Sequence, residues 1–138
     1  MSDPARLAAS GPRAVGRPAE YEQLVRAIFD GAVLHYGPAQ PDPDLALLRG
    51  DQLFARGLEM LAELGDLEAT AELADVISLV AQAQAAGDGE LADAIWEAGA
   101  IAVGWGATDE LEAAKALARA GGDGAAFALR EAARASWR

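Results

Sequence analysis

Residues 48–66 read LRGDQLFARGLEMLAELGD, and this stretch carries the most informative hydrophobic pattern of the chain. Its apolar residues recur at helical spacing, but they cover a wide arc of the helix instead of one narrow stripe. A helix that is apolar over so much of its circumference has to be buried on more than one side. The pattern therefore predicts a central helix or a subunit interface. The apolar residues of this arc are Leu53, Phe54, Leu58, Met60, Leu61 and Leu64.

The sequence on either side of this stretch predicts further helices that are joined by short loops. Pro18 suits a first helical turn, Gly65 and Asp66 end one helix and cap the next, and Thr108 caps another. Gly50 interrupts the helical pattern, with Asp51 as a candidate N-cap after it. Neighbouring helices with short connections pack antiparallel. The predicted helices cover approximately residues 18–36, 45–64, 66–86, 90–105, 108–120 and 123–138.

The composition indicates an all-α fold. The chain has 138 residues, 52% of them are apolar, and about a quarter of all positions are Ala, the strongest helix former. The β-branched and aromatic residues that favour strands are scarce. We therefore expect a single helical domain over residues 18–138, built as an antiparallel bundle of about six helices. Residues 1–17 contain two Pro and two Gly without an apolar period, which predicts a disordered N-terminal arm.

The charge of the chain argues against several classes of partner. The formal net charge is −11 and the isoelectric point is about 4.3. Such a surface repels nucleic acid and anionic membranes, but it suits a basic protein partner. The sequence has no Cys, no apolar run near the length of a membrane span, and no signal-peptide pattern. These features predict a cytoplasmic protein without a membrane span.

No set of residues forms a convincing active site in the sequence. The single histidine, His35, has no neighbouring nucleophile, which favours a role as a helix C-terminal cap. Asp42 and Asp44 lie on either side of Pro43 in a loop, where helix capping is the expected role. Two carboxylates four residues apart share a helix face, but the chain has no DDxxD run. We therefore predict no catalytic residue, no cofactor site and no metal site.

Several segments resemble the trans-polyprenyl diphosphate synthases, whose corresponding helix reads approximately AGDxLxARAxELLAELGD. Further segments are similar to the LFEA, GALLAG, EE and GxAFQI segments of that family, in the same order and at similar spacing. The resemblance covers residues 48–135 and implies a fragment of an isoprenoid-synthase-like helical fold. The matching segments are residues 48–66, 95–98, 99–104, 108–112 and 124–129.

The chain departs from this family at the motifs that carry its chemistry. Where the family has its second aspartate-rich motif, residues 130–135 read REAARA, and only Glu131 keeps a negative charge. The family's Lys-Thr pair falls on Leu91 and Ala92. The resemblance is thus to a shortened, motif-degenerate member. Its prenyltransferase activity needs Mg²⁺ held by carboxylate clusters, so Mg²⁺ is expected only at a composite site completed by a partner.

Two functions from different classes follow. The first is a non-catalytic small subunit of a heteromeric polyprenyl diphosphate synthase, which docks on a catalytic chain in isoprenoid biosynthesis. The alternative is a homodimeric helical module that binds proteins or apolar ligands, with Trp96 and Trp105 as candidate pocket residues beside their ordinary role in a core. A residual enzyme with a composite site is a third possibility. The expected partner interface consists of Leu53, Phe54, Leu58, Met60, Leu61, Ile77 and Val80.

Overall fold

Side-chain caps set the starts of most helices in the computed structural model, which describes residues 2–137. Asp42, Asp66, Asp88 and Thr108 each accept a hydrogen bond from the backbone N–H three residues further on, at 3.0–3.1 Å. The caps at Asp66 and Thr108 confirm the sequence prediction. The elements are α1 (Pro4–Ala9), the 3₁₀ turn η1 (Pro12–Ala14), α2 (Pro18–Tyr36), α3 (Pro43–Leu64), α4 (Leu67–Ala85), α5 (Gly89–Trp105), α6 (Asp109–Arg119) and α7 (Ala125–Trp137).

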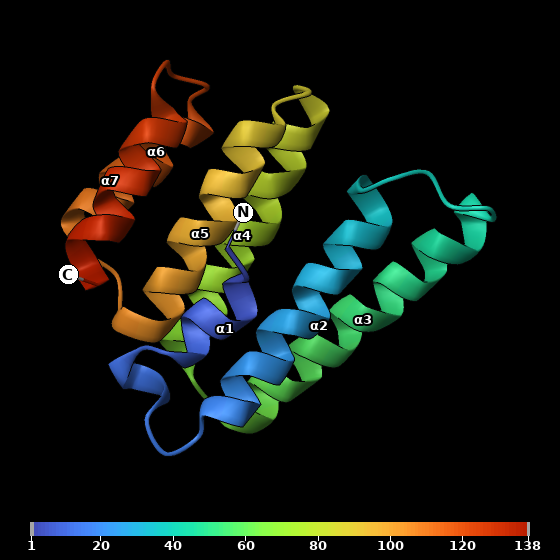
Figure 1. Cartoon of the computed structure of the whole chain (residues 1–138), viewed down its shortest axis with the longest axis horizontal. Helices are drawn as coiled ribbons and strands as arrows, with labels where there is room; N and C mark the ends of the chain where they lie inside the picture. The colour runs from blue at the N-terminus through green and yellow to red at the C-terminus, as the bar shows by residue number, and fades with distance from the viewer. Residues whose placement is uncertain (1, 138) are drawn as a thin grey trace.

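The helices form three successive pairs, α2–α3, α4–α5 and α6–α7 (Figure 1). The α4–α5 pair lies in the middle, with α2–α3 on one side and α6–α7 on the other. Every regular element within residues 2–137 is helical, so the prediction of an all-α helical bundle is confirmed. Residues 2–137 form one α-helix more than the approximately six that the sequence predicts, because α1 lies in the predicted arm.

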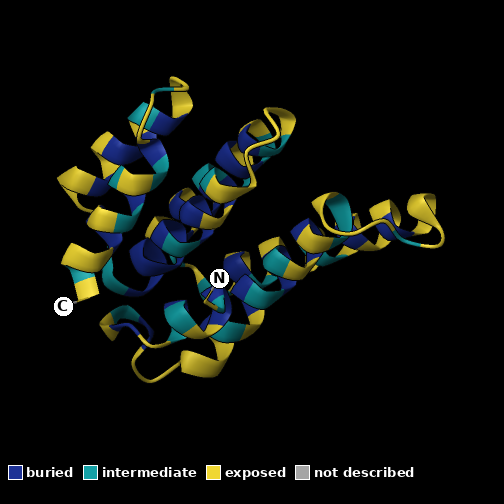
Figure 2. Cartoon of the chain, turned by 45° about the horizontal axis from the view of Figure 1, so that its top comes forward, coloured by how far each residue is buried: buried dark blue, intermediate teal, exposed yellow. Residues whose placement is uncertain are grey.

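Helix α5 is the central helix of the bundle. It packs against α4, α7 and α1, and buried positions extend along most of its length from Ala92 to Gly104 (Figure 2). Ala and Gly supply many of these positions, so neighbouring helices can approach closely. Of the two alternatives predicted for residues 45–64, the central helix is therefore wrong, since α3 lies at the outer edge of the bundle and packs mainly on α2. The subunit interface stays a prediction.

Helix α3 runs without interruption through Gly50, contrary to the predicted break at that residue. A Cβ atom at Gly50 would overlap the His35 ring, and one at Gly57 would overlap Ile28. Both glycines therefore serve close packing of α3 on α2 instead of ending a helix. Asp51 lies within α3 and does not cap it.

The N-terminal segment is ordered over Pro4–Ala14, contrary to the predicted disordered arm. Asp3 caps α1, and its carboxylate also lies 2.7 Å from the Arg26 guanidinium on α2. Ala5, Ala8 and Ala14 are fully buried against α2 and α5. Leu7 packs partly buried against the core, but the fully buried positions of this segment are mostly small alanines, and for this reason no apolar period marks it in the sequence.

Candidate protein-docking surface

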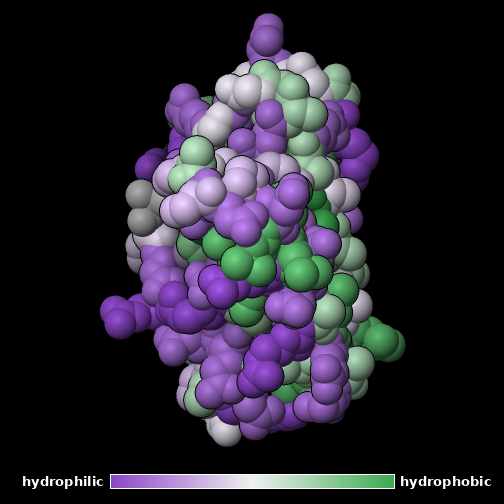
Figure 3. Space-filling view, turned by 90° about the vertical axis from the view of Figure 1, so that its right-hand side faces the viewer, coloured by the Kyte–Doolittle hydropathy of each residue, from purple (hydrophilic) through white to green (hydrophobic). Residues whose placement is uncertain are grey.

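The α2–α3 hairpin presents the largest share of exposed apolar side chains. Six of the ten large hydrophobic residues that are exposed within residues 2–137 belong to it. Their exposed fractions run from 40% to 55%, with Leu48 the highest. Figure 3 views this side of the molecule and shows apolar side chains gathered at its centre within a hydrophilic border. The hairpin surface, as we call it, consists of Val33, Tyr36, Leu45, Leu47, Leu48 and Leu58.

One flank of α3 carries a seam with coiled-coil spacing. Leu47, Asp51, Phe54, Leu58 and Leu61 follow one another at intervals of four, three, four and three residues. Residues at this spacing lie side by side along a helix and form the stripe that packs against a partner helix in coiled coils. Leu61 is buried at the base of the seam, whereas Leu47 and Leu58 are about half exposed. The outer part of the seam is therefore open.

The opposite flank of α3 is also apolar. At 100° per residue, Leu45 and Leu48 lie on the side of the helix away from its contact with α2. Their exposed fractions are 40% and 55%. The first turns of α3 thus expose apolar side chains on both flanks, whereas its solvent face further along is polar, with Arg56, Glu59 and Glu63 exposed. One neighbouring helix, α2, covers only part of α3.

The single polar position in the seam already has a partner. Asp51 Oδ1 lies 3.1 Å from His35 Nε2, and the edge of the His35 ring packs on Phe54 with ring centroids 4.9 Å apart. His35 therefore joins α2 to α3 and does not cap its own helix, contrary to the sequence prediction. The last turn of α2 is closed by the backbone N–H of Gly37, which donates to the Val33 carbonyl at 2.8 Å.

The residues predicted as a partner interface divide into three groups. Leu58 is exposed, and Leu53, Phe54, Met60 and Ile77 are half-buried. Leu61 and Val80 are each only 2% exposed, because both pack into the chain's own core. The prediction is therefore wrong for Leu61 and Val80, which a partner cannot reach in this fold.

Sequence reasoning missed five of the six residues of the hairpin surface. A signal for Leu47 was present, since it lies seven residues before Phe54 and extends the same stripe. Leu45 and Leu48 were visible as apolar residues on the far side of that helix. Val33 and Tyr36 on α2 border the stripe of buried residues on that helix. Hydrophobic periodicity alone therefore does not show whether they are buried or exposed.

Residues 130–135 contain one carboxylate, that of Glu131. Glu131 is exposed, and its carboxylate lies 3.0 Å from the Arg134 guanidinium. On the same helix, Arg130 lies 3.2 Å from Glu90 and 3.7 Å from Glu97. Across residues 2–137, no three His, Asp or Glu side chains come together in an arrangement that could hold a metal ion. A composite Mg²⁺ site would need almost all of its ligands from a partner.

The tryptophan-lined pocket suggested by the sequence is small. Trp96 is 5% exposed and packs edge-to-face on Phe29, with ring centroids 5.0 Å apart. The cavity beside these two rings has a volume of about 130 Å³. Sites for small organic ligands usually measure about 300–1,000 Å³. Trp96 is therefore a core residue that joins α2 to α5.

Comparisons with known proteins give no relative for this chain. No protein-family model matches it, and neither a curated protein nor a solved structure matches it. The resemblance to polyprenyl diphosphate synthases therefore rests on the quoted segments of residues 48–135 alone. In the part of the chain that the structure describes, no helix combines the length and apolar content required to cross a membrane.

Proposed function

We propose that this chain is a non-catalytic docking subunit that binds a protein partner through the hairpin surface. The observation that carries the proposal is the mismatch on α3, which is apolar on both flanks but is covered mainly by α2. Because the four exposed leucines of the hairpin are 40–55% exposed, covering each contributes about half of the 1.5–3 kcal/mol of a full Leu burial. Association itself costs several kcal/mol, so a specific complex has to cover several of these leucines together.

The spacing of the seam favours a helical partner. An amphipathic helix that lies along Leu47, Phe54 and Leu58 would insert its side chains between them, as in helix-in-groove recognition. The net charge of −11 favours a partner whose contacting helix is basic at its edges. A complex of this kind forms faster at low salt, because the long-range attraction is screened as ionic strength rises.

The resemblance of residues 48–135 supplies the partner to test first, a catalytic polyprenyl diphosphate synthase chain from the same source. In such a complex this chain would act on product length by packing beside the catalytic subunit. The near absence of clustered carboxylates around Glu131 supports a non-catalytic role. The docking proposal itself rests on the hairpin surface and does not depend on the identity of the partner.

Self-association is the second candidate, and the two-helix form of the hairpin favours it. Two hairpins related by a two-fold axis would complete a four-helix bundle and would cover the seam of each copy with the other. In this case the same surface is used, but the partner is a second copy of the chain.

Light scattering coupled to size-exclusion chromatography distinguishes these outcomes. The full chain is run alone and mixed with the catalytic synthase chain, next to the double variant Leu47→Glu/Leu58→Glu. We expect a complex with the synthase or a dimer, and at least a tenfold loss of affinity in the variant, since two buried carboxylates cost well over 1.4 kcal/mol. Leu67→Glu is the matched control, because Leu67 is 82% exposed and lies outside the hairpin.

Three results would contradict the proposal. If Leu67→Glu weakened the complex as much as the hairpin variant, the hairpin surface would not be the docking site. If the purified chain alone produced longer prenyl diphosphates with Mg²⁺ and allylic and homoallylic substrates, the non-catalytic role would be wrong. A chain that stays monomeric with every synthase tested, and whose hairpin variant behaves like the original, would also refute it.

A further inference from the structure

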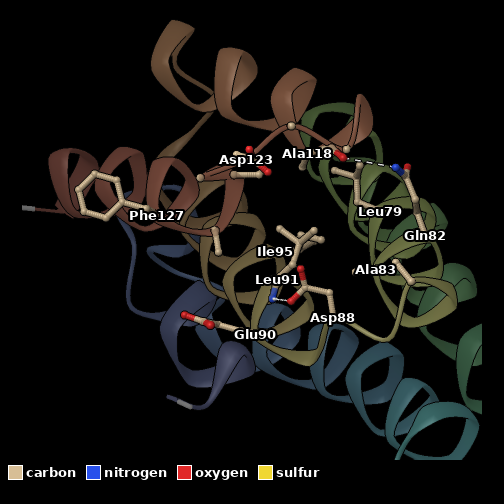
Figure 4. A pocket seen from close by; sticks show the side chains of 16 residues that line it. Leu79, Gln82, Ala83, Asp88, Glu90, Leu91, Ile95, Ala118, Asp123 and Phe127 are labelled. Carbon is tan, nitrogen blue, oxygen red and sulfur yellow. Dashed lines mark hydrogen bonds between the residues drawn. The ribbon is translucent and has the colours of Figure 1, made fainter.

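A second cavity lies between the α4–α5 pair and the α6–α7 pair, apart from the hairpin surface. The last turn of α4, the first turns of α5 and the turn between α6 and α7 enclose a cavity of about 450 Å³ (Figure 4). This volume falls within the range of about 300–1,000 Å³ that is usual for small-molecule sites. The cavity shares no residue with the hairpin surface.

The floor of the cavity is apolar and firmly held. Leu79, Ala83 and Ile95 are each at most 3% exposed, and they belong to the continuous core of the bundle. The side chain of Gln82 fixes one wall, because its Nε2 donates to the backbone carbonyl of Arg119 at 2.9 Å. This hydrogen bond joins α4 to the end of α6. The cavity is therefore formed before any ligand arrives.

The rim of the cavity is negatively charged. Asp88, Glu90 and Asp123 line it, and no Lys, Arg or His is among the described residues of its wall. Glu90 is paired with Arg130 at 3.2 Å. No ion pair found within residues 2–137 includes Asp88 or Asp123. Two carboxylates thus face the opening without a cationic partner.

The two carboxylates of Asp88 and Asp123 lie where they could bind a cationic group above the apolar floor. Figure 4 shows Asp88 and Asp123 on opposite sides of Leu91 and Ile95. One oxygen of Asp88 accepts the Leu91 backbone N–H at 3.0 Å, which fixes the direction of the carboxylate. The starts of two helices and the ends of two others meet at this cavity, so their dipoles largely cancel. The carboxylates therefore determine the sign of the local potential.

We propose that this cavity binds a small organic cation. Its hydrocarbon body would lie against the half-buried Leu91, above the floor formed by Leu79, Ala83 and Ile95, and its ammonium group would lie between Asp88 and Asp123. Apolar burial supplies affinity, while the two unpaired carboxylates supply preference for a positive charge. The same arrangement repels an organic anion of equal size. The overall charge of −11 adds long-range attraction for cations.

Three probes with one hydrocarbon skeleton test this proposal: phenylbutylamine, phenylbutanol and phenylbutyrate. Each is titrated into the full ¹⁵N-labelled chain at low salt, and binding is followed by amide chemical shifts. We expect the amine to shift the amides of residues 88–91 and 121–124, and to bind about tenfold tighter than the alcohol. The carboxylate should bind most weakly. Equal affinities for the amine and the alcohol would overturn the proposal, as would the absence of shifts at these amides.

Substitutions test whether the carboxylates of Asp88 and Asp123 cause the preference for the amine over the alcohol. Asp88→Asn/Asp123→Asn should lower the affinity for the amine to that for the alcohol and leave the alcohol unaffected. Asn keeps the N-cap at residue 88, so the fold is preserved, and Asp123→Asn alone gives a milder second variant. The control Asp44→Asn/Glu59→Gln removes the same charge from exposed positions of α3. If the control weakens amine binding as much as the cavity variant, a specific site is refuted.

Discussion

The hydroxyl of Tyr21 on α2 donates a 2.7 Å hydrogen bond to Oδ2 of Asp66, the residue that caps α4. The other oxygen of this carboxylate accepts from the Arg13 guanidinium at 2.7 Å and from the Ala69 backbone N–H at 3.0 Å. Burial by itself would raise the pKa of Asp66, but the Ala69, Tyr21 and Arg13 contacts outweigh it and hold the pKa below its usual value. One carboxylate therefore ties the N-terminal segment, α2 and α4 together.

This network predicts a pH-dependent part of the stability. Because the pKa of Asp66 is lower in the folded state, its contribution is present above the unfolded-state pKa of about 3.9 and is lost as pH falls through the folded-state value. Asp66→Asn should cost about 1.5–3 kcal/mol at neutral pH, since it removes the charge from three hydrogen bonds. Urea denaturation followed by circular dichroism at pH 7 and pH 3 measures the difference, which should narrow at the lower pH. Asp44→Asn is the exposed control. If the stability difference between the original chain and Asp66→Asn were as large at pH 3 as at pH 7, the Asp66 carboxylate would not be the source of the pH dependence.

A buried ion cluster joins α4 to α6. Nζ of Lys115 lies 2.7 Å from Glu72 and 2.7 Å from Asp75, and the side chains of Lys115 and Glu72 are each 7% exposed. Burial would lower the pKa of Lys115, but hydrogen bonds to Asp75, Glu112 and Glu72 reverse this effect and raise it, so the lysine stays charged. Lys115→Met should therefore destabilise the fold by about 3–5 kcal/mol, because it leaves Glu72 buried without a partner.

The double variant Lys115→Met/Glu72→Leu tests this explanation, because it removes both charges together. Replacing a buried pair by apolar residues of similar size is often close to neutral, so we expect the double variant to recover most of the loss. The free energy of unfolding in urea is measured for both single variants and the double variant. A double variant as unstable as the sum of the single variants would show that the pair is not coupled.

The close contact between the N-terminal segment and α5 predicts that replacing Gly104 by Ala lowers the stability of the fold. A Cβ at Gly104 would lie 2.6 Å from the backbone carbonyl oxygen of Ala8, and backbone cannot move aside as a side chain can. Gly104→Ala should thus destabilise the fold, although Ala is favoured over Gly in a helix by about 1 kcal/mol. Thermal unfolding and limited proteolysis near residue 10 measure the effect. Gly89→Ala is the control, since nothing lies within 4 Å of a Cβ there, and an equally mild result at both positions would contradict the packing.

The contact between Phe29 and Trp96 predicts that the tryptophan fluorescence changes when the Phe29 ring is removed. Because these rings meet edge-to-face across α2 and α5, Phe29→Ala should expose Trp96 to water and shift its fluorescence to longer wavelength. The loss of a half-buried ring should also cost about 2–4 kcal/mol in urea unfolding, near the lower end of the range for Phe→Ala in cores. Phe127→Ala serves as the control, since Phe127 is 70% exposed. Equal effects of the two substitutions would argue against this contact.

Much of the fold could be predicted because its signals are local. The helix boundaries at Asp66 and Thr108 follow from capping chemistry, which involves residues only three positions apart. The order of α1 could not be predicted in this way, because Ala5 and Ala8 become informative only when α5 is placed beside them. Gly50 was misleading for the same reason, since the feature that requires glycine is the His35 ring on another helix.

The candidate surface was only partly predictable. The hydrophobic period places Leu58 and Leu61 on the same side of α3, yet one is exposed and the other is buried. The difference depends on where α2 and α4 cover α3, which no local pattern contains. The cavity beside Asp88 and Asp123 had no sequence signal, because its walls come from four helices that meet only in the folded chain.

The six residues of α1 are too few for an isolated helix to persist in water, so its helical form depends on contact with α2 and α5. Warming should release this short helix before the longer helices melt, because its ordering rests on the burial of Pro4, Ala5 and Ala8 and on a few polar contacts. Once it has detached, the hydrogen bond of Tyr21 to Asp66 and the aromatic contact of Phe29 with Trp96 would remain as links between the hairpin and the central pair. The hairpin would then be free to swing about these two links, so the first loss of rigidity in the molecule would be a hinge motion.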